Sequence, residues 1–237
     1  MADRLTRIAS LSRIGLVIQY VAGQARELGI KRQSYHFSPS FEVPTSARTT
    51  VYAEGFDRAW LDLYDREEFR ALDPIPERTM RHGKLLEWTD AMTIERNTAD
   101  HERYFAAMRK HGLLHGFGLP VFGSLDRDAY SSFDFEKPLF EIPGDTIAML
   151  KALAQSGHQR VCELLDSETK RPTLSEREAE TLQWLARGKS ITDTATILDL
   201  SPDTVKTYVR RVYEKLDAND RIEAVVKGLR LRLIHFQ

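Results

Sequence analysis

The sequence predicts an α+β domain followed by an all-helical domain. Up to residue 165, short segments rich in aromatic and β-branched residues lie between amphipathic helical segments, which indicates an α-β-α sandwich on an antiparallel sheet. A polar stretch at residues 166–173 lacks apolar periodicity and contains Pro172, as a linker would. At 237 residues the chain is long enough for two domains. We therefore expect domains at residues 1–165 and 174–237, joined by a linker at residues 166–173.

The elements of the first domain follow from local patterns. Helices are predicted at residues 4–28, 57–69, 98–111 and 144–165. Strands are predicted at residues 35–38, 49–52, 116–122 and 130–136. A phosphorylated receiver domain would instead alternate strands with helices and carry an acidic pair after its first apolar strand, and this sequence has no such pair. The order of elements thus favours a layered sandwich.

Four short helices are predicted in the second domain from residues that begin or end helices. Ser175 and Glu178 form a capping box at the start of the first, in which each side chain binds the other residue's backbone amide. Gly188 ends this helix, and the second follows at residues 190–198. Ser201 is a suitable N-cap for the third helix, with Pro202 in its first position, and the fourth covers residues 221–233. The second domain is therefore expected to be an all-α four-helix domain.

The third of these helices has an apolar face and a basic face. Its apolar residues recur at spacings of 4, 3 and 4 positions: Val205, Val209, Val212 and Leu216. The opposite face and the start of the helix carry the residues expected to contact DNA: Thr204, Lys206, Thr207, Arg210 and Arg211. Two short helices joined by a tight turn, the second one basic outward, form the arrangement that places a helix in the major groove. Taken alone, the pattern also fits a small helical bundle whose charges are solvated.

Composition restricts the partners and the compartment. The net charge is −1, but residues 204–216 contain four basic residues and one acidic residue, which suffices for local contact with phosphates. No apolar run approaches the roughly 18 residues that span a bilayer, so we expect no membrane partner. The single cysteine, Cys162, cannot form an internal disulfide, which suits a reducing compartment. We therefore expect a cytoplasmic protein.

A series of residues at defined spacing runs through the second domain. It consists of Leu174-Ser-Glu-Arg-Glu178, Leu182, Ala186-Arg-Gly-Lys189, Ile197-Leu-Asp-Leu-Ser201, Thr204-Val-Lys206 and Lys215-Leu216. In this series, nearly all of residues 173–230 resembles the LuxR-type helix-turn-helix. Two residues depart from the family pattern: Thr194 stands at a usually apolar position, and Tyr208 where histidine is frequent. The resemblance implies binding to double-stranded DNA. Because one recognition helix covers only a few base pairs, we expect a homodimer on a palindromic operator.

A second series of residues lies in the first domain. Six positions stand out: Trp60, Tyr64, Asp73, Pro74, Trp88 and Gly116. Together with Gly112 and Pro120, they follow the order and spacing of the acyl-homoserine-lactone-binding domain of LuxR-type quorum-sensing regulators. Most of residues 30–135 resembles that domain. The resemblance implies a transcription regulator that senses an acyl-homoserine lactone or a related small signal.

The resemblance also implies roles for individual pocket residues. An acyl-homoserine lactone is neutral and offers one amide N–H, a lactone carbonyl, an acyl carbonyl and an apolar tail. Asp73 is expected to accept the amide N–H, and the Trp60 indole, which only donates, to serve the lactone carbonyl. Tyr64, one helical turn after Trp60, is expected to stack beside the ligand. The remaining expected contacts are Trp88 and Phe105 around the lactone ring, Ser132 on the acyl carbonyl, and Phe56 beside it.

Two features of the first domain depart from the family pattern. Phe56 stands where the family commonly has a tyrosine whose hydroxyl binds the acyl carbonyl, and losing a neutral hydrogen bond costs about 1 kcal/mol. On the first strand, His36, Ser38 and Ser40 alternate onto one face, where relatives tend to be apolar. If this face lines the pocket, the signal is short, aromatic or oxygenated, or is not a lactone. The other interpretation is that this face is solvated or packs on backbone.

Other functions remain open on the sequence alone. Trp60 and Tyr64 also fit a core, Asp73 before proline also fits a turn, and Gly116 also fits close backbone packing. An enzyme is disfavoured, because the seven histidines form no metal-ligand spacing and no Gly-x-Ser-x-Gly motif occurs. We therefore predict no catalytic residue, no metal and no cofactor. The main alternative is a regulator of the same fold that senses a non-lactone molecule or a partner protein.

Overall fold

The computed structural model describes residues 2–38, 45–168 and 172–235, so that Ser40 of the alternating strand face lies outside the described residues. The chain divides into two compact units, Met1–Ser167 and Glu168–Gln237. Each unit has a hydrophobic core of its own. The last helix of the first unit, α8, spans Gly144–Glu168 and therefore continues into the segment predicted to be the linker.

The first unit is built on a five-stranded antiparallel sheet with the strand order β2-β1-β5-β4-β3. The strands are β1 (Arg32–Phe37), β2 (Thr50–Glu54), β3 (Leu86–Glu87), β4 (Gly116–Val121) and β5 (Ala129–Asp134). All but β3 are predicted from the sequence, and β3 is too short to show a pattern. Ser34 lies opposite Ser132 and Tyr35 opposite Ser131, so alternate residues of β1 point to opposite faces of the sheet.

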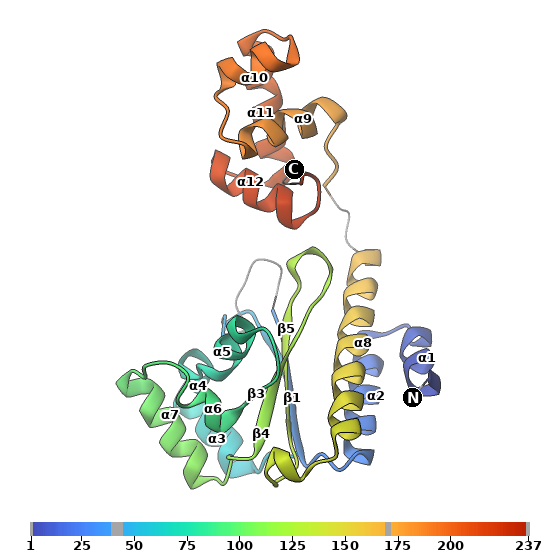
Figure 1. Cartoon of the computed structure of the whole chain (residues 1–237), viewed down its shortest axis with the longest axis vertical. Coiled ribbons are helices and arrows are strands. Elements are labelled where there is room, and N and C mark those ends of the chain that lie inside the picture. The colour runs from blue at the N-terminus through green and yellow to red at the C-terminus, as the bar shows by residue number, and fades with distance from the viewer. Residues whose placement is uncertain (1, 39–44, 169–171, 236–237) are drawn as a thin grey trace. The chain divides into compact units, whose positions relative to one another are not determined.

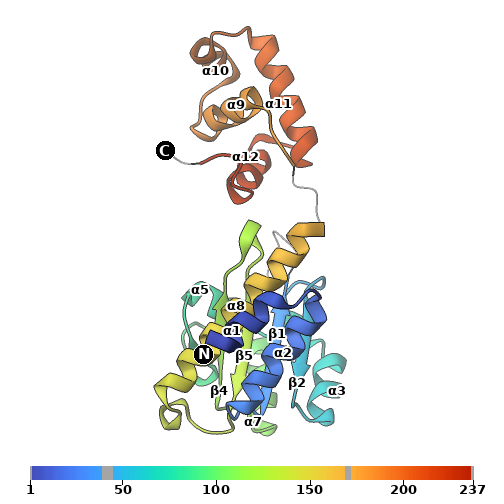
Figure 2. The ribbon, with the colours of Figure 1, turned by 90° about the vertical axis from the view of Figure 1, so that its right-hand side faces the viewer.

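Helices cover both faces of this sheet, which confirms the predicted α-β-α sandwich (Figure 1). On one face lie α3 (Arg58–Arg66), α4 (Phe69–Leu72), α5 (Ile75–His82), α6 (Trp88–Ala91) and α7 (Ala99–Lys110). On the other face lie α1 (Ala2–Ser10), α2 (Ile14–Glu27) and α8, as the turned view also shows (Figure 2). Two short 3₁₀ turns occur at Ser124–Asp126 and Leu139–Glu141. The core on the α3–α7 side is rich in aromatic residues.

Several helical segments differ from the sequence prediction, among them the short helix α6, which was not predicted. The helix predicted at residues 4–28 is split into α1 and α2, and the backbone carbonyl of Leu11 in the break accepts a hydrogen bond from Arg160 Nε at 2.9 Å. The helix predicted at residues 57–69 is split into α3 and α4, where Glu68 takes a left-handed φ of 52°. Helix α5 was not predicted, because Pro74 and Pro76 indicate a turn, although a first helical turn tolerates proline.

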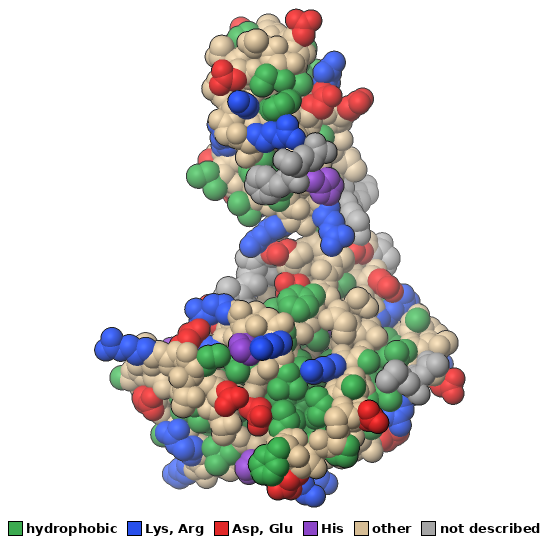
Figure 3. All heavy atoms as spheres, viewed as in Figure 1, with side chains coloured by type: hydrophobic (Ala, Val, Ile, Leu, Met, Phe, Trp, Pro, Cys, Tyr) green, Lys and Arg blue, Asp and Glu red, His purple; other side chains and the backbone are tan. Residues whose placement is uncertain are grey.

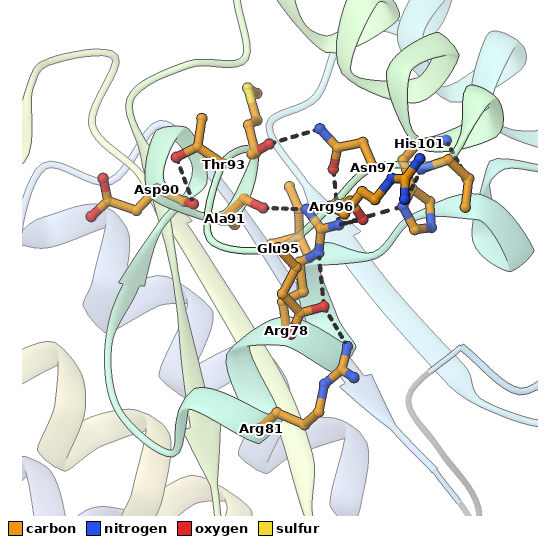
Figure 4. Close-up of polar contacts among 12 residues, drawn as sticks. Arg78, Arg81, Asp90, Ala91, Thr93, Glu95, Arg96, Asn97 and His101 are labelled. Atoms are coloured by element: carbon orange, nitrogen blue, oxygen red, sulfur yellow. Dashed lines mark hydrogen bonds and ion pairs between the residues drawn. The ribbon is translucent and has the colours of Figure 1, made fainter.

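A buried arginine connects the helices on the aromatic side of the sheet (Figure 4). Arg78 on α5 is 2% exposed and donates to the carbonyl of Ala91 at 2.6 Å and to the Asn97 side chain at 2.8 Å. Its guanidinium lies 5.6 Å from the ring centre of Phe105 on α7. Because a buried charge without partners is strongly destabilising, these contacts hold α6 and the loop after it against α5 and α7. No sequence pattern identified Arg78.

The second unit contains four helices between residues 172 and 235, as predicted. They are α9 (Glu176–Ala186), α10 (Ile191–Leu198), α11 (Pro202–Leu216) and α12 (Arg221–Arg230). The capping box of Ser175 and Glu178 is present, and Ser201 caps α11 by accepting the Thr204 N–H at 3.1 Å. Thr194, which departs from the family pattern, is completely buried, and its hydroxyl has no hydrogen-bond partner among the described residues. The core of this unit includes Leu182, Val212, Leu216 and Ala224.

Candidate functional site

A cavity of about 210 Å³ lies between the sheet and the α3–α7 layer. Six of the seven predicted ligand residues line it: Phe56, Trp60, Tyr64, Asp73, Trp88 and Ser132. Its apolar walls include Val51, Ala53, Leu61, Ile75, Met108 and Leu113. The polar or aromatic lining residues that the sequence analysis did not assign to the pocket are Ser34, Asp65, Arg70, Tyr104 and Tyr130. Apolar walls with a few placed polar groups are typical of small-molecule sites.

The carboxylate of Asp73 is held by several hydrogen bonds. One oxygen accepts the Ile75 N–H at 2.9 Å, and the hydroxyls of Tyr64 and Tyr104 also donate to the carboxylate. A carboxylate has about four acceptor positions, so these three bonds leave one position for a ligand donor. Burial raises the pKa of Asp73 to about 7, against the opposing effect of these hydrogen bonds. A ligand N–H that binds here would therefore favour the ionised form.

Trp60 and Tyr64 belong both to the cavity wall and to an aromatic cluster. Their ring centres lie 5.8 Å apart, and the Trp60 ring lies 6.1 Å from Tyr104 and 5.4 Å from His111. Asp57 fixes the start of α3 by accepting the Trp60 N–H at 2.6 Å. On the sequence alone, Trp60 and Tyr64 fitted either a core or a pocket. Both interpretations hold, because these side chains pack among aromatic rings and also line the cavity.

The Trp88 ring occupies space that Gly116 leaves empty. A Cβ atom at Gly116 would lie 2.5 Å from atoms of the Trp88 ring, so a larger residue would displace the indole from the cavity wall. The Trp88 indole N–H donates to the Tyr130 hydroxyl at 3.4 Å. Gly116 thus permits close packing of a side chain, in place of the close backbone packing that was the alternative on the sequence alone.

Polar side chains of two neighbouring strands form the sheet side of the cavity. Ser34 and His36 of β1 line it together with Ser132 of β5. The Ser34 Oγ lies 3.0 Å from His36 Nε2 and 2.7 Å from Ser132 Oγ. Burial lowers the pKa of His36 to about 3, so its ring is neutral. The polar strand face predicted from the sequence therefore reaches the cavity through His36, whereas Ser38 is buried without lining it.

Phe105, the seventh predicted ligand residue, does not line the cavity. It is completely buried next to Arg78, and its neighbour Tyr104 lines the cavity instead. Tyr104 and Met108 are one helical turn apart and both face the cavity, which is the spacing that could have distinguished this face of α7. Tyr130 likewise precedes Ser132 by two positions, as same-face residues of a strand do.

Helix α11 presents basic side chains to solvent. Lys206, Arg210 and Arg211 are exposed. Lys206 Nζ lies 3.0 Å from the carboxylate of Asp203, and Arg210 Nε lies 4.0 Å from that of Glu214. Exposed ion pairs of this kind are weak, so the cations are able to contact phosphates or base edges. On the face that Figure 3 shows, basic and acidic side chains are interspersed on both units.

Three further residues of α11 are engaged within the second unit. The Thr204 hydroxyl lies 2.8 Å from Ser201 Oγ, and the Thr207 hydroxyl donates to a backbone carbonyl one turn earlier at 3.0 Å. Lys215 Nζ donates to the carboxylate of Glu178 at 2.6 Å, and the Glu178 side chain is 4% exposed. Lys215 therefore stabilises the domain and does not extend the basic face.

No cluster of three or more His, Cys, Asp or Glu side chains that could hold a metal occurs among the described residues. Cys162 is buried, and burial raises the pKa of its thiol to about 11, which disfavours the reactive thiolate. No helix in the described ranges is long and apolar enough to cross a membrane.

A small-molecule cavity in one unit and a helix-turn-helix in the other define a ligand-responsive, DNA-binding transcription regulator. Residues 16–161 match the family model of the autoinducer binding domain, and residues 172–227 match that of the bacterial regulatory proteins of the luxR family. The chain therefore belongs to the LuxR family of autoinducer-binding transcription regulators. Members of this family are regulators and not enzymes.

Relatives with known names agree with this membership. The chain is 33% identical to the quorum sensing-dependent transcriptional regulator RpaR of Rhodopseudomonas palustris over 77% of this chain and 74% of the relative. It is 27% identical to the quorum-sensing regulator RhlR of Pseudomonas aeruginosa over 89% of this chain and 86% of the relative. The fold is similar to that of Escherichia coli SdiA, with a TM-score of 0.73 and 22% identity, over 98% of this chain and 96% of SdiA.

Proposed function

We propose that the cavity binds an acyl-homoserine lactone and that the bound lactone controls DNA binding by the helix-turn-helix. The observation that carries this proposal is the carboxylate of Asp73, which has one acceptor position left after three hydrogen bonds within the described residues. An acyl-homoserine lactone has one N–H donor. The relatives RpaR and RhlR, which are quorum-sensing regulators, support the same class of signal.

The other polar groups of the ligand have partners in the cavity. We assign the Trp60 indole, which only donates, to the lactone carbonyl, and the Ser132 hydroxyl to the acyl carbonyl. Trp88 then packs against the lactone ring. Tyr64 acts through its hydroxyl, which holds Asp73, as well as through its ring. The volume of about 210 Å³ is below the roughly 300 Å³ of the smaller ligand pockets and favours a compact acyl group.

On the DNA side, we propose that the regulator acts as a cytoplasmic homodimer on a palindromic operator. One recognition helix reads few base pairs, so two half-sites are needed for specificity. Lys206, Arg210 and Arg211 supply the exposed cations of this helix, and Thr204 and Thr207 lie beside them. We assign the ligand-binding domain to residues 1–165, with α8 continuing to Glu168, and the DNA-binding domain to residues 174–237.

The ligand assignment is tested with Asp73→Asn, which preserves shape and removes the carboxylate. Purified full-length protein is titrated with hexanoyl-homoserine lactone, and we expect affinity to fall at least about tenfold, because a hydrogen bond to a charged group is lost. Asp62→Asn, an exposed position on α3, is the matched control and should bind as the wild type does. Equal affinity of Asp73→Asn and the wild type would exclude Asp73 as the partner of the amide.

The DNA assignment is tested with Lys206→Ala and Arg210→Ala. Each should weaken operator binding by roughly 1–3 kcal/mol in gel-shift titrations if the side chain contacts base edges. Folding should be unchanged, because both side chains are exposed. Arg177→Ala, an exposed arginine on α9, is the matched control for the loss of one positive charge. Wild-type affinity of the double mutant would exclude α11 as the reading helix.

A signal that is not a lactone is the second candidate, and the polar strand face favours it. Ser34 and His36 replace apolar surface on the sheet side of the cavity, which a long alkyl tail would not match. Mass spectrometry of small molecules that co-purify with the chain distinguishes the two. A partner protein as signal is a third possibility, and the presence of a lined cavity favours a small molecule over it.

A further inference from the structure

A row of hydrogen-bonding side chains on α8 binds the loop between β4 and β5, residues 122–128, which lies beside the end of this helix (Figure 1). The row has the spacing of one helix face and consists of Gln155, His158, Cys162 and Asp166. The Gln155 side chain binds the backbone N–H and carbonyl of Phe122, at 3.1 and 2.7 Å. His158 Nε2 donates to the carbonyl of Arg127 at 2.6 Å, and the Cys162 thiol contacts the same oxygen. The loop is thus attached along one face of α8.

The last contact of this row holds the end of the helix. The carboxylate of Asp166 accepts from Arg127 Nη1 on one oxygen and from Ser124 Oγ on the other, the latter at 2.9 Å. The side chains of Arg127 and Asp166 are 11% and 14% exposed, so water and salt screen this ion pair little. Asp166 lies in the final turn of α8, which ends at Glu168. Because a helix end without tertiary contacts frays, release of this carboxylate would free the final turn.

The loop has a strained backbone that its contacts with α8 maintain. Leu125 and Asp126 take left-handed φ angles of 58° and 61°, which cost free energy in residues with a Cβ atom. A Cβ atom at Gly123 would lie 2.6 Å from Cys162 Sγ and 2.7 Å from His158 Nε2, so the loop backbone packs directly on the helix. Strain of this kind persists where the surroundings enforce it, and it is typical of switch segments. Release from α8 would relieve the strain, which brings the bound and released states closer in free energy.

One tyrosine connects this loop with a strand that lines the ligand cavity. The Tyr35 hydroxyl lies 2.7 Å from His158 Nδ1. The neighbours of Tyr35 on β1, Ser34 and His36, line the cavity from the other face of the sheet. A ligand that shifts or fixes β1 therefore acts on His158, and through the carbonyl of Arg127 on the loop.

We propose that the β4–β5 loop is a latch on the end of α8, which ligand binding closes and which regulates the length of the connection to the DNA-binding unit. With the latch closed, α8 runs to Glu168, and six residues separate it from Ser175, the N-cap of α9. With the latch open, residues 163–168 leave the helix and the connection doubles in length. A longer connection spans a wider range of separations between two half-sites. The roles of the ligand and of the half-sites rest on the proposed function, whereas the latch itself rests on the contacts of α8.

Hydrogen exchange of the purified full chain tests the latch, with peptides that report on residues 163–168. Asp166→Ala should speed exchange of these amides at least about tenfold, because the bonds to Arg127 and Ser124 are lost. Alanine is the best helix former, so the gain cannot come from helix propensity. Glu163→Ala, which removes an exposed carboxylate from the same end of α8, is the matched control and should exchange as the wild type does. Equal exchange in Asp166→Ala and the wild type would overturn the latch. Should Asp166→Ala not fold, Ser124→Ala removes one of the two bonds and should speed exchange about threefold.

Selection of binding sites from a random DNA library tests the consequence for the operator. The wild type should enrich paired half-sites at one separation, and Asp166→Ala should enrich them over a range of separations. The control Glu163→Ala should select as the wild type does. The same single separation for the wild type and Asp166→Ala would overturn the regulatory role of the latch. If the wild type enriches no paired half-sites, the proposed function on DNA fails, and the exchange experiment still decides the latch.

Hexanoyl-homoserine lactone tests the connection between the cavity and the latch. It should slow exchange of residues 163–168 in the wild type at least about threefold, because a ligand that closes the latch binds the closed state more tightly. Tyr35→Phe keeps the ring and removes the hydroxyl that binds His158, so the lactone should still bind but no longer slow this exchange. A lactone that binds and leaves the wild-type exchange unchanged would overturn the connection. A folded wild type that binds no lactone would contradict the proposed function, and Asp166→Ala would still decide the latch.

Discussion

Two buried histidines on opposite faces of one sheet differ in how completely they are hydrogen-bonded. Nδ1 of His158 on α8 lies 2.7 Å from the Tyr35 hydroxyl, and its Nε2 lies 2.6 Å from the carbonyl of Arg127. Among the described residues, His36 has a hydrogen-bond partner for Nε2 alone, Ser34. Burial lowers the pKa of both rings, to about 4 for His158 and to about 3 for His36. Both histidines are therefore buried and neutral. They differ in that Nδ1 of His36, beside the cavity, has no partner among the described residues.

The two rings are connected through one strand. Side chains along β1 alternate between the two faces of the sheet. Ser34 and His36 face the cavity, and Tyr35 faces α8. A carbonyl only accepts, so His158 carries its proton on Nε2 and the Tyr35 hydroxyl donates to Nδ1. Every polar atom of this ring has a protein partner. The α8 side of the sheet is thus held by protein groups, whereas the cavity side has positions that a ligand can fill.

The largest expected effect is on stability. His158→Leu leaves the Tyr35 hydroxyl and the Arg127 carbonyl without their partner and should lower the free energy of unfolding by roughly 2–4 kcal/mol. His36→Leu, on the cavity side, should change it by less than about 1 kcal/mol, because one bond is lost and a ring nitrogen without a partner among the described residues is removed. Urea unfolding of the ligand-free protein measures both. Equal losses at the two positions would contradict the distinction between the two faces.

The next effect is on ligand affinity as a function of pH. Because burial raises the pKa of Asp73 to about 7 from 3.8, the ligand-free fold favours the protonated form, and this contribution to stability is present below pH 3.8 and lost as the pH rises through 7. An amide N–H prefers the ionised carboxylate. Lactone affinity should therefore rise with pH up to about 7, about tenfold per pH unit below it, and then level off. Asp73→Asn should flatten the profile, and a flat wild-type profile would show that the ligand does not discriminate between the two forms.

A smaller effect is expected at Phe56, which lines the cavity without a hydroxyl. With an acyl-homoserine lactone as signal, Phe56→Tyr adds a second donor to the acyl carbonyl beside Ser132 and should raise sensitivity by up to about tenfold. With another class of signal, the added hydroxyl is buried without a partner and should reduce the response. A dose–response panel of lactones on both proteins separates the two cases. Silence of both proteins across the panel would contradict lactone sensing.

The smallest effect concerns a buried hydroxyl that has no hydrogen-bond partner in the described part of the chain and does not line the ligand cavity. Thr194 is completely buried, and its hydroxyl has no partner among the described residues. Thr194→Val removes this hydroxyl and should raise the free energy of unfolding of the DNA-binding domain by about 1 kcal/mol. Operator affinity should not change. Thermal unfolding checks the gain, and a loss of stability would mean that the hydroxyl is satisfied in solution.

Much of the fold and most of the site could be predicted from residue order, because each signal was local. The capping box of Ser175 and Glu178 and the polar alternation through His36 depend on neighbours within a few positions, and both are found in the structure. The Phe105 prediction failed by one residue, since only the packing of α7 shows that Tyr104 faces the cavity. Arg70 and Arg78 gave no signal, because their partners lie far along the chain.

The central claim is that the remaining acceptor position of Asp73 receives the amide N–H of the signal. It is tested most directly with two ligands that differ in one atom, hexanoyl-homoserine lactone and the ester in which oxygen replaces its amide nitrogen. The wild type should bind the amide at least about tenfold more tightly than the ester, and Asp73→Asn should bind the two within about twofold of each other. Equal binding of amide and ester by the wild type, or an unchanged preference in Asp73→Asn, would contradict the account.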